Sequence, residues 1–303
     1  MNLQQLITFT TVINEGSMTA AAERLFLTQP AVSQQIRNLE EEMGVELLVR
    51  GVRQAKTTLQ GQILFDYAKR IISLTQQAEV AIQTIGAEIS GSLRIGTINS
   101  LGLYLISPVV GLFLKHNSKL TIGLNYARGE EIIEEFNKGN LDVAILPNTE
   151  TEFGTALTNA DKRLLLKDEV WLCASGKEPG LPQKISVEDL NQKPMVTLTN
   201  TYPNFESKVK QAMSSTKTPY SPVFESTNVG TLKRVVESGL GWGFLPAHSI
   251  RKQVRMGRMS TVDVSDMRYD ADVYYYWQKN HPNKTVEVFY KAIEQQIKST
   301  PNR

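Results

Sequence analysis

Apolar residues in the first sixty positions recur at helical spacing, and the runs are separated by residues that end helices. The first run consists of Leu3, Leu6, Ile7, Val12 and Ile13. It predicts an amphipathic helix that ends at Gly16. Ser17 or Thr19 then caps a second, Ala-rich helix, whose expected apolar face comprises Ala22, Leu25 and Phe26.

A third helix is predicted from Thr28 to about Met43. Thr28 is a suitable cap, and Pro30 lies near the start, where a missing N–H costs nothing. Gly44 predicts the end of this helix, and its expected core residues are Val32, Ile36 and Leu39. Two short helices with a tight connection, after a supporting helix, form a helix-turn-helix pattern. The basic, β-branched stretch ELLVRGVRQAKTTLQG that follows predicts a small strand pair, or wing.

A long helix is predicted from Thr58 to about Glu88, because this stretch has no Pro and only one Gly before residue 86. Apolar residues recur in it at seven-residue intervals, as a helical dimer requires. The expected dimer interface consists of Leu64, Tyr67, Ile71, Leu74, Ala78 and Ile85. The alternative is that this helix packs on its own domain.

After Gly86, Ser90 and Gly91 the pattern changes to alternating strands and helices, which predicts a mainly parallel sheet covered by helices. The expected first set is strand 93–98, helix 102–115, strand 120–126, a helix around 132–136 and strand 141–146. The second set is strand 168–174, helix 186–190, strand 195–199, helix 204–214, strand 222–226, helix 229–238 and strand 242–245. A strand at 271–278 and a final helix complete the chain.

Composition adds little to this picture. The net charge is +2, with 41% hydrophobic and 21% charged residues, which is ordinary globular usage. The uncharged stretch 95–114 is long enough to span a bilayer, but Asn99, Ser100 and Ser107-Pro108 interrupt it. No basic residue precedes Arg24, which argues against a secretory signal, so a cytoplasmic location is expected.

Several segments together resemble LysR-type transcriptional regulators. The segment LTQPAVSQQIRNLEEEMGVELLVR (27–50) is similar to the N-terminal signature of that family. TTLQG (57–61), GSLRIG (91–96), GNLDVAIL (139–146) and VESGLGWGFLP (236–246) follow in the expected order and spacing.

The resemblance implies an α/β protein with an N-terminal winged helix-turn-helix, a long linker helix and a C-terminal two-lobed effector domain like a periplasmic binding protein. The expected boundaries are 1–58, 59–89 and 90–303. Lobe I would comprise about 90–163 and 268–303, and lobe II about 164–267. The expected partners are double-stranded promoter DNA, a small anionic effector and further copies of the chain in a homodimer or homotetramer. RNA polymerase is a further candidate partner.

Residues 1–60 contain five Lys/Arg and six Asp/Glu, so this segment has no general positive charge. DNA binding therefore has to depend on where individual polar and basic side chains lie. The N-terminal turns of a recognition helix face base edges, and basic residues of a wing reach the backbone or the minor groove. The candidate DNA contacts are Thr28, Gln29, Pro30, Ser33, Gln34, Arg37, Arg50, Arg53 and Lys56.

Effector binding is expected where two strands run into helix starts, at the 99–102 and 199–203 turns. Free N–H groups at these helix starts favour an anion, and Arg128 would add a positive charge unless it is merely a surface residue. The candidate effector contacts are Asn99, Ser100, Leu101, Arg128, Asn200, Thr201, Tyr202 and Val229.

Other functional classes lack support in the sequence. No catalytic or metal-binding motif is found, and no cofactor is expected. A solute-binding protein would have no use for residues 1–60. A regulator that is redox-controlled or independent of any ligand stays open. However, Cys173 is the only cysteine and lies within a predicted strand.

Overall fold

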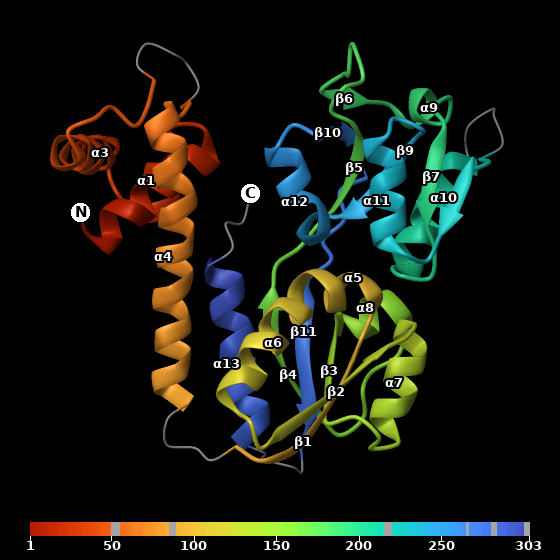
Figure 1. The fold of residues 1–303 in the computed structure, drawn as a ribbon. Coiled ribbons are helices and arrows are strands. Elements are labelled where there is room, and N and C mark those ends of the chain that lie inside the picture. Colours follow the sequence, from red (N-terminus) through yellow and green to blue (C-terminus); the bar gives the residue numbers. More distant parts are fainter. Residues whose placement is uncertain (50–54, 85–88, 215–219, 265–266, 280–283, 300–303) are drawn as a thin grey trace. The chain divides into compact units, whose positions relative to one another are not determined.

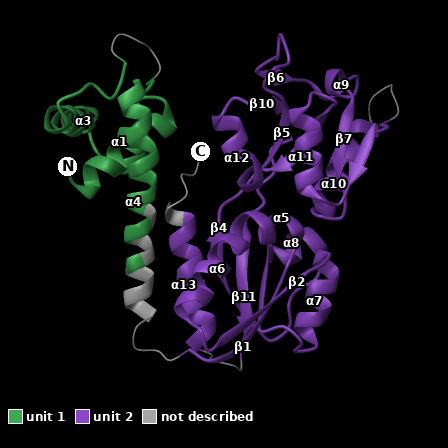
Figure 2. Cartoon of the chain, in the orientation of Figure 1, with its two compact units in different colours: residues 1–86, 298–303 green, residues 87–297 purple. Residues whose placement is uncertain are grey.

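The computed structural model describes residues 1–49, 55–84, 89–214, 220–264, 267–279 and 284–299 (Figure 1). The chain forms two compact units, residues 1–86 with 298–303 and residues 87–297 (Figure 2). This division separates the predicted helix-turn-helix and linker segments from the predicted α/β segment.

The first unit begins with three short helices and continues into a long one. They are α1 (Leu3–Glu15), α2 (Met18–Leu25), α3 (Gln29–Met43) and α4 (Leu59–Thr84). Ser17 and Thr28 cap α2 and α3, and Gly16 and Gly44 adopt the left-handed conformation after α1 and α3. These caps confirm the boundaries predicted from the sequence. Residue 85 and the predicted helix end at 88 lie outside the described residues.

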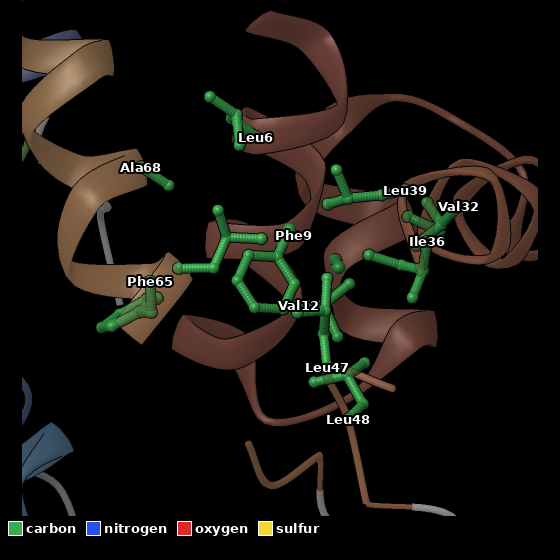
Figure 3. Close-up of a cluster of buried hydrophobic side chains, with 13 residues drawn as sticks. Leu6, Phe9, Val12, Val32, Ile36, Leu39, Leu47, Leu48, Phe65 and Ala68 are labelled. Atoms are coloured by element: carbon green, nitrogen blue, oxygen red, sulfur yellow. The ribbon is translucent and has the colours of Figure 1, made fainter. Parts of the chain in front are cut away.

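One hydrophobic core holds this unit together (Figure 3). Phe9 of α1 and the three predicted α3 residues, Val32, Ile36 and Leu39, are buried in it. The start of α4 contributes Leu64, Phe65 and Ala68. The first turns of α4 therefore pack on their own domain, as the alternative interpretation of this helix expected.

The wing is defined by a bridge between Leu48 and Thr57 and by a 2.8 Å hydrogen bond from Val49 N–H to the Lys56 carbonyl. Glu40, near the end of α3, accepts the N–H groups of Leu47 and Leu48 at 2.8 and 3.2 Å. The Glu40 carboxylate thus fixes the wing to α3. Residues 50–54, including Arg50 and Arg53, lie outside the described residues.

Phe26 differs from its predicted place on the apolar face of α2. The helix ends at Leu25, and Phe26 takes the left-handed conformation (φ 54°) with 97% of its surface exposed. The reason is local. The N–H of Phe26 closes the helix by bonding to the Ala22 and Glu23 carbonyls, and this turn points its side chain away from the core.

The second unit contains two sheets, each with its own helices. We call the five-stranded sheet and its helices the first lobe. Its strand order is β2-β1-β3-β11-β4, with β1 (Gly91–Thr97), β2 (Leu120–Tyr126), β3 (Val143–Pro147), β4 (Ala160–Leu166) and β11 (Val273–Gln278). Strands β1, β2 and β3 are parallel, whereas β11 is antiparallel to both β3 and β4. Its helical segments are α5 (Asn99–Leu101), η1 (Gly102–Ile106), α6 (Ser107–His116), α7 (Gly129–Asn137), α8 (Thr149–Phe153) and α13 (Lys284–Ser299).

The second lobe is built on a six-stranded sheet of order β6-β10-β5-β9-β7-β8. The strands are β5 (Val170–Ser175), β6 (Lys184–Ile185), β7 (Met195–Leu198), β8 (Phe224–Ser226), β9 (Trp242–Pro246) and β10 (Met259–Val264). The helices are α9 (Val187–Leu190), α10 (Pro203–Ser214), α11 (Val229–Glu237) and α12 (Ala247–Arg255). Both sheets are mixed rather than mainly parallel, because the chain returns from one lobe to the other.

Two chain segments join the lobes, and they are hydrogen-bonded to each other. Glu169 and Asp270 form an antiparallel bridge. Val170 N–H donates to the Tyr269 carbonyl at 3.0 Å, and Ala271 N–H donates to the Asp168 carbonyl at 2.7 Å. We call residues 168–170 and 269–271 the crossing ribbon.

The sequence pattern located most elements of this unit but missed α8, α12, β4, β6 and β10. The expected helix at 102–115 begins earlier, at Asn99, and includes a π-helical turn over Gly102–Ile106. The uncharged stretch 95–114 is therefore divided between a strand and helical segments. Among the described helices, none has the length and apolar character to cross a membrane.

The backbone of α4 at Gly61 lies close to the backbone of Leu47, so substitution of Gly61 tests the packing of the first unit. A β-carbon at this position would collide with the Leu47 carbonyl. We expect Gly61→Ala to destabilise the unit by about 1–3 kcal/mol, as overpacking does, in chemical unfolding followed by circular dichroism. Gly111→Ala, on α6 with open space around it, is the matched control and should be neutral or slightly stabilising. Equal unfolding curves for the two variants would contradict the proposed steric constraint.

Candidate functional site

The N-terminal turns of α3 present polar side chains to solvent. Thr28 accepts the Ala31 N–H, and Gln29, Pro30, Gln34 and Arg37 are exposed, whereas Ser33 is half-buried. Gln29 Nε2 donates to Ser33 Oγ at 3.2 Å, and Arg37 Nη2 donates to Gln34 Oε1 at 3.0 Å. These exposed amide and guanidinium groups have the geometry for base-edge or phosphate contacts.

A groove of about 440 Å³ runs between α2, α3 and the wing. Polar residues on it include Ser17, Thr19, Ser33 and Arg37, and the wing contributes Leu48, Val49 and Ala55. Lys56, which follows Ala55 in the sequence, is exposed. The structure therefore brings the recognition helix and the described part of the wing together on one surface.

The exposed face of α4 carries most of the predicted dimer residues. Tyr67, Ile71, Leu74 and Ala78 are exposed, and Leu74 has 64% of its surface accessible. Leu64 is only 8% exposed because it packs in the core of its own unit, so we remove it from the predicted interface. Ile85 lies outside the described residues.

The two predicted effector turns differ in how far their polar groups are satisfied. In the first turn, Ser100 and Leu101 are buried, and the side-chain oxygens of Asn99 and Ser100 have no hydrogen-bond partner. In the second turn, Asn200 is exposed with a left-handed backbone (φ 59°), and Thr201 and Tyr202 are buried. Val229, at the start of α11, is buried in the core of the second lobe.

The expectation of free N–H groups at the second turn is wrong. Glu206 accepts the N–H groups of Thr201 and Tyr202 at 3.1 and 3.3 Å. Glu152, from α8 of the first lobe, accepts those of Asn204 and Phe205 at 2.8 and 3.3 Å. The protein's own carboxylates therefore occupy the N-terminus of α10.

The Glu152 carboxyl is a direct link between the lobes. It is buried, and it also accepts a hydrogen bond from the Tyr269 hydroxyl, which in turn accepts one from Asn204 Nδ2 at 3.0 Å. Burial raises the pKa of Glu152 above its ordinary value, and the hydrogen bonds from Tyr269, Phe205 and Asn204 oppose that rise. Sequence reasoning missed this residue because Glu152 and its partners are separated by about fifty residues or more in the chain.

Arg128 lies on the surface. It precedes α7, is exposed, and donates from Nε to Glu131 at 2.6 Å. Its charge thus already has a partner on its own helix.

A second cluster that the sequence did not reveal surrounds Asp168 of the crossing ribbon. The Asp168 side chain is fully buried; it accepts the N–H of His248 at 3.1 Å, lies 2.6 Å from His248 Nδ1 and pairs with Arg251 at 3.1 Å. About eighty residues separate Asp168 from its partners, so no local pattern could have revealed the cluster.

Two other candidate chemistries receive no support from the described residues. Burial raises the pKa of the Cys173 thiol strongly, and a thiol with a raised pKa is a poor redox sensor. In the part of the chain that the structure describes, no group of three or more His, Cys, Asp or Glu side chains could hold a metal ion.

A helix-turn-helix unit with a wing, linked to a two-lobed α/β unit, defines a DNA-binding regulator with an effector-binding domain. Comparison with known families identifies both parts. Residues 3–62 match the family "Bacterial regulatory helix-turn-helix protein, lysR family", and residues 86–298 match "LysR substrate binding domain". The chain belongs to the LysR family of transcriptional regulators.

Individual relatives agree with this assignment. The chain is 29% identical to a "Probable RuBisCO transcriptional regulator" of Cyanidioschyzon merolae, over 93% of this chain and 92% of the relative. It is 28% identical to the "Nitrogen assimilation regulatory protein nac" of Escherichia coli, over 83% and 80%. Among solved structures, full-length BenM aligns over 100% of both chains with a TM-score of 0.54 and 24% identity. CrgA of Neisseria meningitidis aligns over 98% and 99% with a TM-score of 0.55 and 21% identity.

The raised pKa of Glu152 predicts a specific pH dependence of stability. A carboxyl whose pKa is higher in the folded chain binds a proton more readily when folded, so the unfolding free energy rises as pH falls through the folded pKa. The unfolding free energy of wild type should therefore rise relative to that of Glu152→Gln as the pH is lowered from 7 towards 4.5, the ordinary pKa of a glutamate. Denaturant unfolding at several pH values measures it. Glu150→Gln, exposed on the same helix, is the control, and a difference that does not vary with pH contradicts the buried carboxyl.

Proposed function

We propose that this LysR-type regulator binds a bipartite, partly palindromic promoter site as a homodimer or homotetramer, and that a small metabolite bound between its two lobes controls transcription. The observation that supports specific DNA binding most directly is the exposed set of amide and guanidinium groups on the first turns of α3. Such groups can bind base edges in the major groove. A regulator of promoter DNA acts where that DNA is, which favours a cytoplasmic location.

The chemistry of each side chain suggests whether it contacts the bases or the DNA backbone. We assign base contacts to Gln29, Ser33 and Gln34, since amide and hydroxyl groups can bind base edges. We assign backbone contacts to Thr28, Pro30 and Lys56 and to the wing arginines Arg50 and Arg53. Arg37 suits either role, because a guanidinium can bind guanine or phosphate.

The proposed dimer interface is the exposed α4 face, with Ile85 added at its far end. Four apolar or aromatic residues lie on this face and take no part in the core of the first unit: Tyr67, Ile71, Leu74 and Ala78. A pair of helices buries residues at this spacing against each other. The other face of α4 packs on its own unit as far as Ile72, and Leu64 lies on that face.

The proposed effector site keeps residues of the two predicted turns, but two of the reasons for expecting an anionic effector no longer hold. We assign effector contacts to Asn99, Ser100, Leu101, Thr201 and Tyr202, with Asn200 and Val229 at the border of the site. Since the α10 N-terminus is occupied and Arg128 is paired with Glu131, neither supplies the positive charge that an anion needs. RNA polymerase is a further candidate partner.

The DNA assignment is tested by comparing Gln29→Ala with Arg53→Ala on operator and random duplexes over a range of salt. Gln29→Ala should lose about 1–3 kcal/mol on the operator and little on random DNA, because only base reading is removed. Arg53→Ala should weaken binding to both and lower the salt slope by about 1. Gln4→Ala, an exposed glutamine on α1, is the control. Equal losses on both duplexes for Gln29→Ala would remove this residue from the base-reading set.

The dimer proposal is tested by Leu74→Glu. An unpaired charge in a packed interface costs about 3–5 kcal/mol, so the oligomer mass in light scattering should fall and operator affinity should drop with it. Leu59→Glu replaces another exposed leucine of α4 that lies off the heptad positions, and it should leave the mass unchanged. A normal mass and normal DNA affinity for Leu74→Glu would show that this face is not the interface.

A further inference from the structure

Three segments of the second unit meet at one hydrogen-bonded cluster. Glu152 lies on α8 of the first lobe, Asn204 and Phe205 lie in the first turn of α10 of the second lobe, and Tyr269 belongs to the crossing ribbon. The Glu152 carboxyl accepts the N–H groups of Asn204 and Phe205 at 2.8 and 3.3 Å, and it also accepts the Tyr269 hydroxyl. That hydroxyl in turn accepts a hydrogen bond from Asn204 Nδ2 at 3.0 Å. We call these four residues the lobe junction.

Aromatic contacts hold Tyr269 against the second lobe. The Tyr269 ring lies 4.8 Å, centre to centre, from the ring of Phe205, which packs edge-on against Phe244 of β9 at 5.2 Å. Lys208, one turn further along α10, places its Nζ 5.0 Å from the centre of the Tyr269 ring. The crossing ribbon and α10 therefore form one packed group at this point. Glu152 is the member of the lobe junction that comes from the other lobe.

Packing within the first lobe fixes the position of Glu152. The N–H of Thr149, at the start of α8, donates to the hydroxyl of Tyr276 on β11 at 3.2 Å. Phe153, at the end of α8, packs so closely on Gly129 of α7 that a β-carbon there would collide with its ring. Helix α8 is thus fixed at both ends to its own lobe. A change in the angle between the lobes would therefore draw the Glu152 carboxyl away from the α10 N–H groups.

The free-energy terms of this contact oppose each other. Glu152 is only 5% exposed, and within the described part of the chain no cationic side chain pairs with it. The N-terminus of α10 favours a negative charge, whereas removal of that charge from water is costly. Burial, together with the nearby Glu206 charge, raises the pKa of Glu152 more than the hydrogen bonds lower it. A carboxylate whose hydrogen bonds only partly offset its burial can leave this position at small cost, so the contact can switch between two arrangements.

We propose that Glu152 is a latch between the two lobes. Its carboxyl holds them at the angle of this structure with no small molecule required, and release of the carboxyl from α10 lets the angle change. The chain thereby supplies its own carboxylate at the place where the lobes meet. The inference concerns the resting state of the protein and does not depend on the class of effector. A ligand that changes the angle has to break or reinforce a contact that already exists.

The latch is tested first by amide hydrogen exchange of the full-length protein, resolved to single residues. In Glu152→Ala the amides of Asn204 and Phe205 should exchange roughly tenfold faster or more, because their acceptor has been removed. The amides of residues 209–213, further along α10, should keep their rates. Glu150→Ala, an exposed glutamate on the same helix, is the control and should change neither set. Unchanged exchange at Asn204 and Phe205 overturns the latch. An equal increase along all of α10 also overturns it, because Glu152 would then support the fold of the helix and not the lobe angle.

The lobe angle itself is measured as the distance between spin labels at Ser118→Cys in the first lobe and Gln192→Cys in the second, both exposed positions. The native Cys173 is buried, so it should take no label, and dilution with unlabelled chains leaves only distances within one chain. Wild type and Glu150→Ala should give the same narrow distance distribution, and Glu152→Ala should give a shifted or broader one. The same distribution in all three proteins overturns the proposal.

A second variant separates the latch from a general loss of packing. Tyr269→Phe removes one hydroxyl and keeps the ring that packs on Phe205. Because that hydroxyl joins Glu152 to Asn204, this variant should change the distance distribution in the same direction as Glu152→Ala and by a smaller amount. The double variant should match Glu152→Ala alone, since both side chains act through one contact. Changes that add in the double variant, or no change in Tyr269→Phe, overturn the assignment of a single latch.

Discussion

The second unit depends on how it satisfies one buried carboxylate, that of Asp168. This side chain is inaccessible to water, so its charge must be balanced inside the protein. Arg251 supplies the opposite charge, and the backbone N–H and Nδ1 of His248 make two further polar contacts with Asp168. All three contacts bind the crossing ribbon to α12. Removing one partner of such a group leaves an uncompensated charge. The position of the start of α12 relative to the crossing ribbon is therefore tied to a single electrostatic requirement.

The sequence predicted best where structure is decided by residues close together in the chain. Ser17, Thr28, Gly16 and Gly44 act within one or two residues of the helix ends they define, so the helices of the first unit could be placed accurately. Phe26 was misplaced because its apolar character suggested the core, whereas the left-handed turn after α2 exposes it. Strand β4 was missed because it carries the exposed charges of Lys162 and Arg163, and β10 because Asp263 interrupts its apolar residues. Strand β6 has only two residues.

The effector region shows why a list of available donors is not enough to locate a binding site. The turns at 99–102 and 199–203 were found from their position after strands, and both do border the meeting of the lobes. Glu152 was not visible as a partner of the second turn, because about fifty residues separate it from Asn204. Glu206 is only four or five residues from Tyr202 and Thr201, so this local partner could have been recognised in the sequence.

The crossing ribbon also limits how the two lobes can move. The two strands, bonded to each other through Val170–Tyr269 and Ala271–Asp168, cannot slide along each other without breaking those bonds. The two connections between the lobes therefore move together rather than separately. A ligand that joins the lobes acts on one paired hinge and not on two independent linkers.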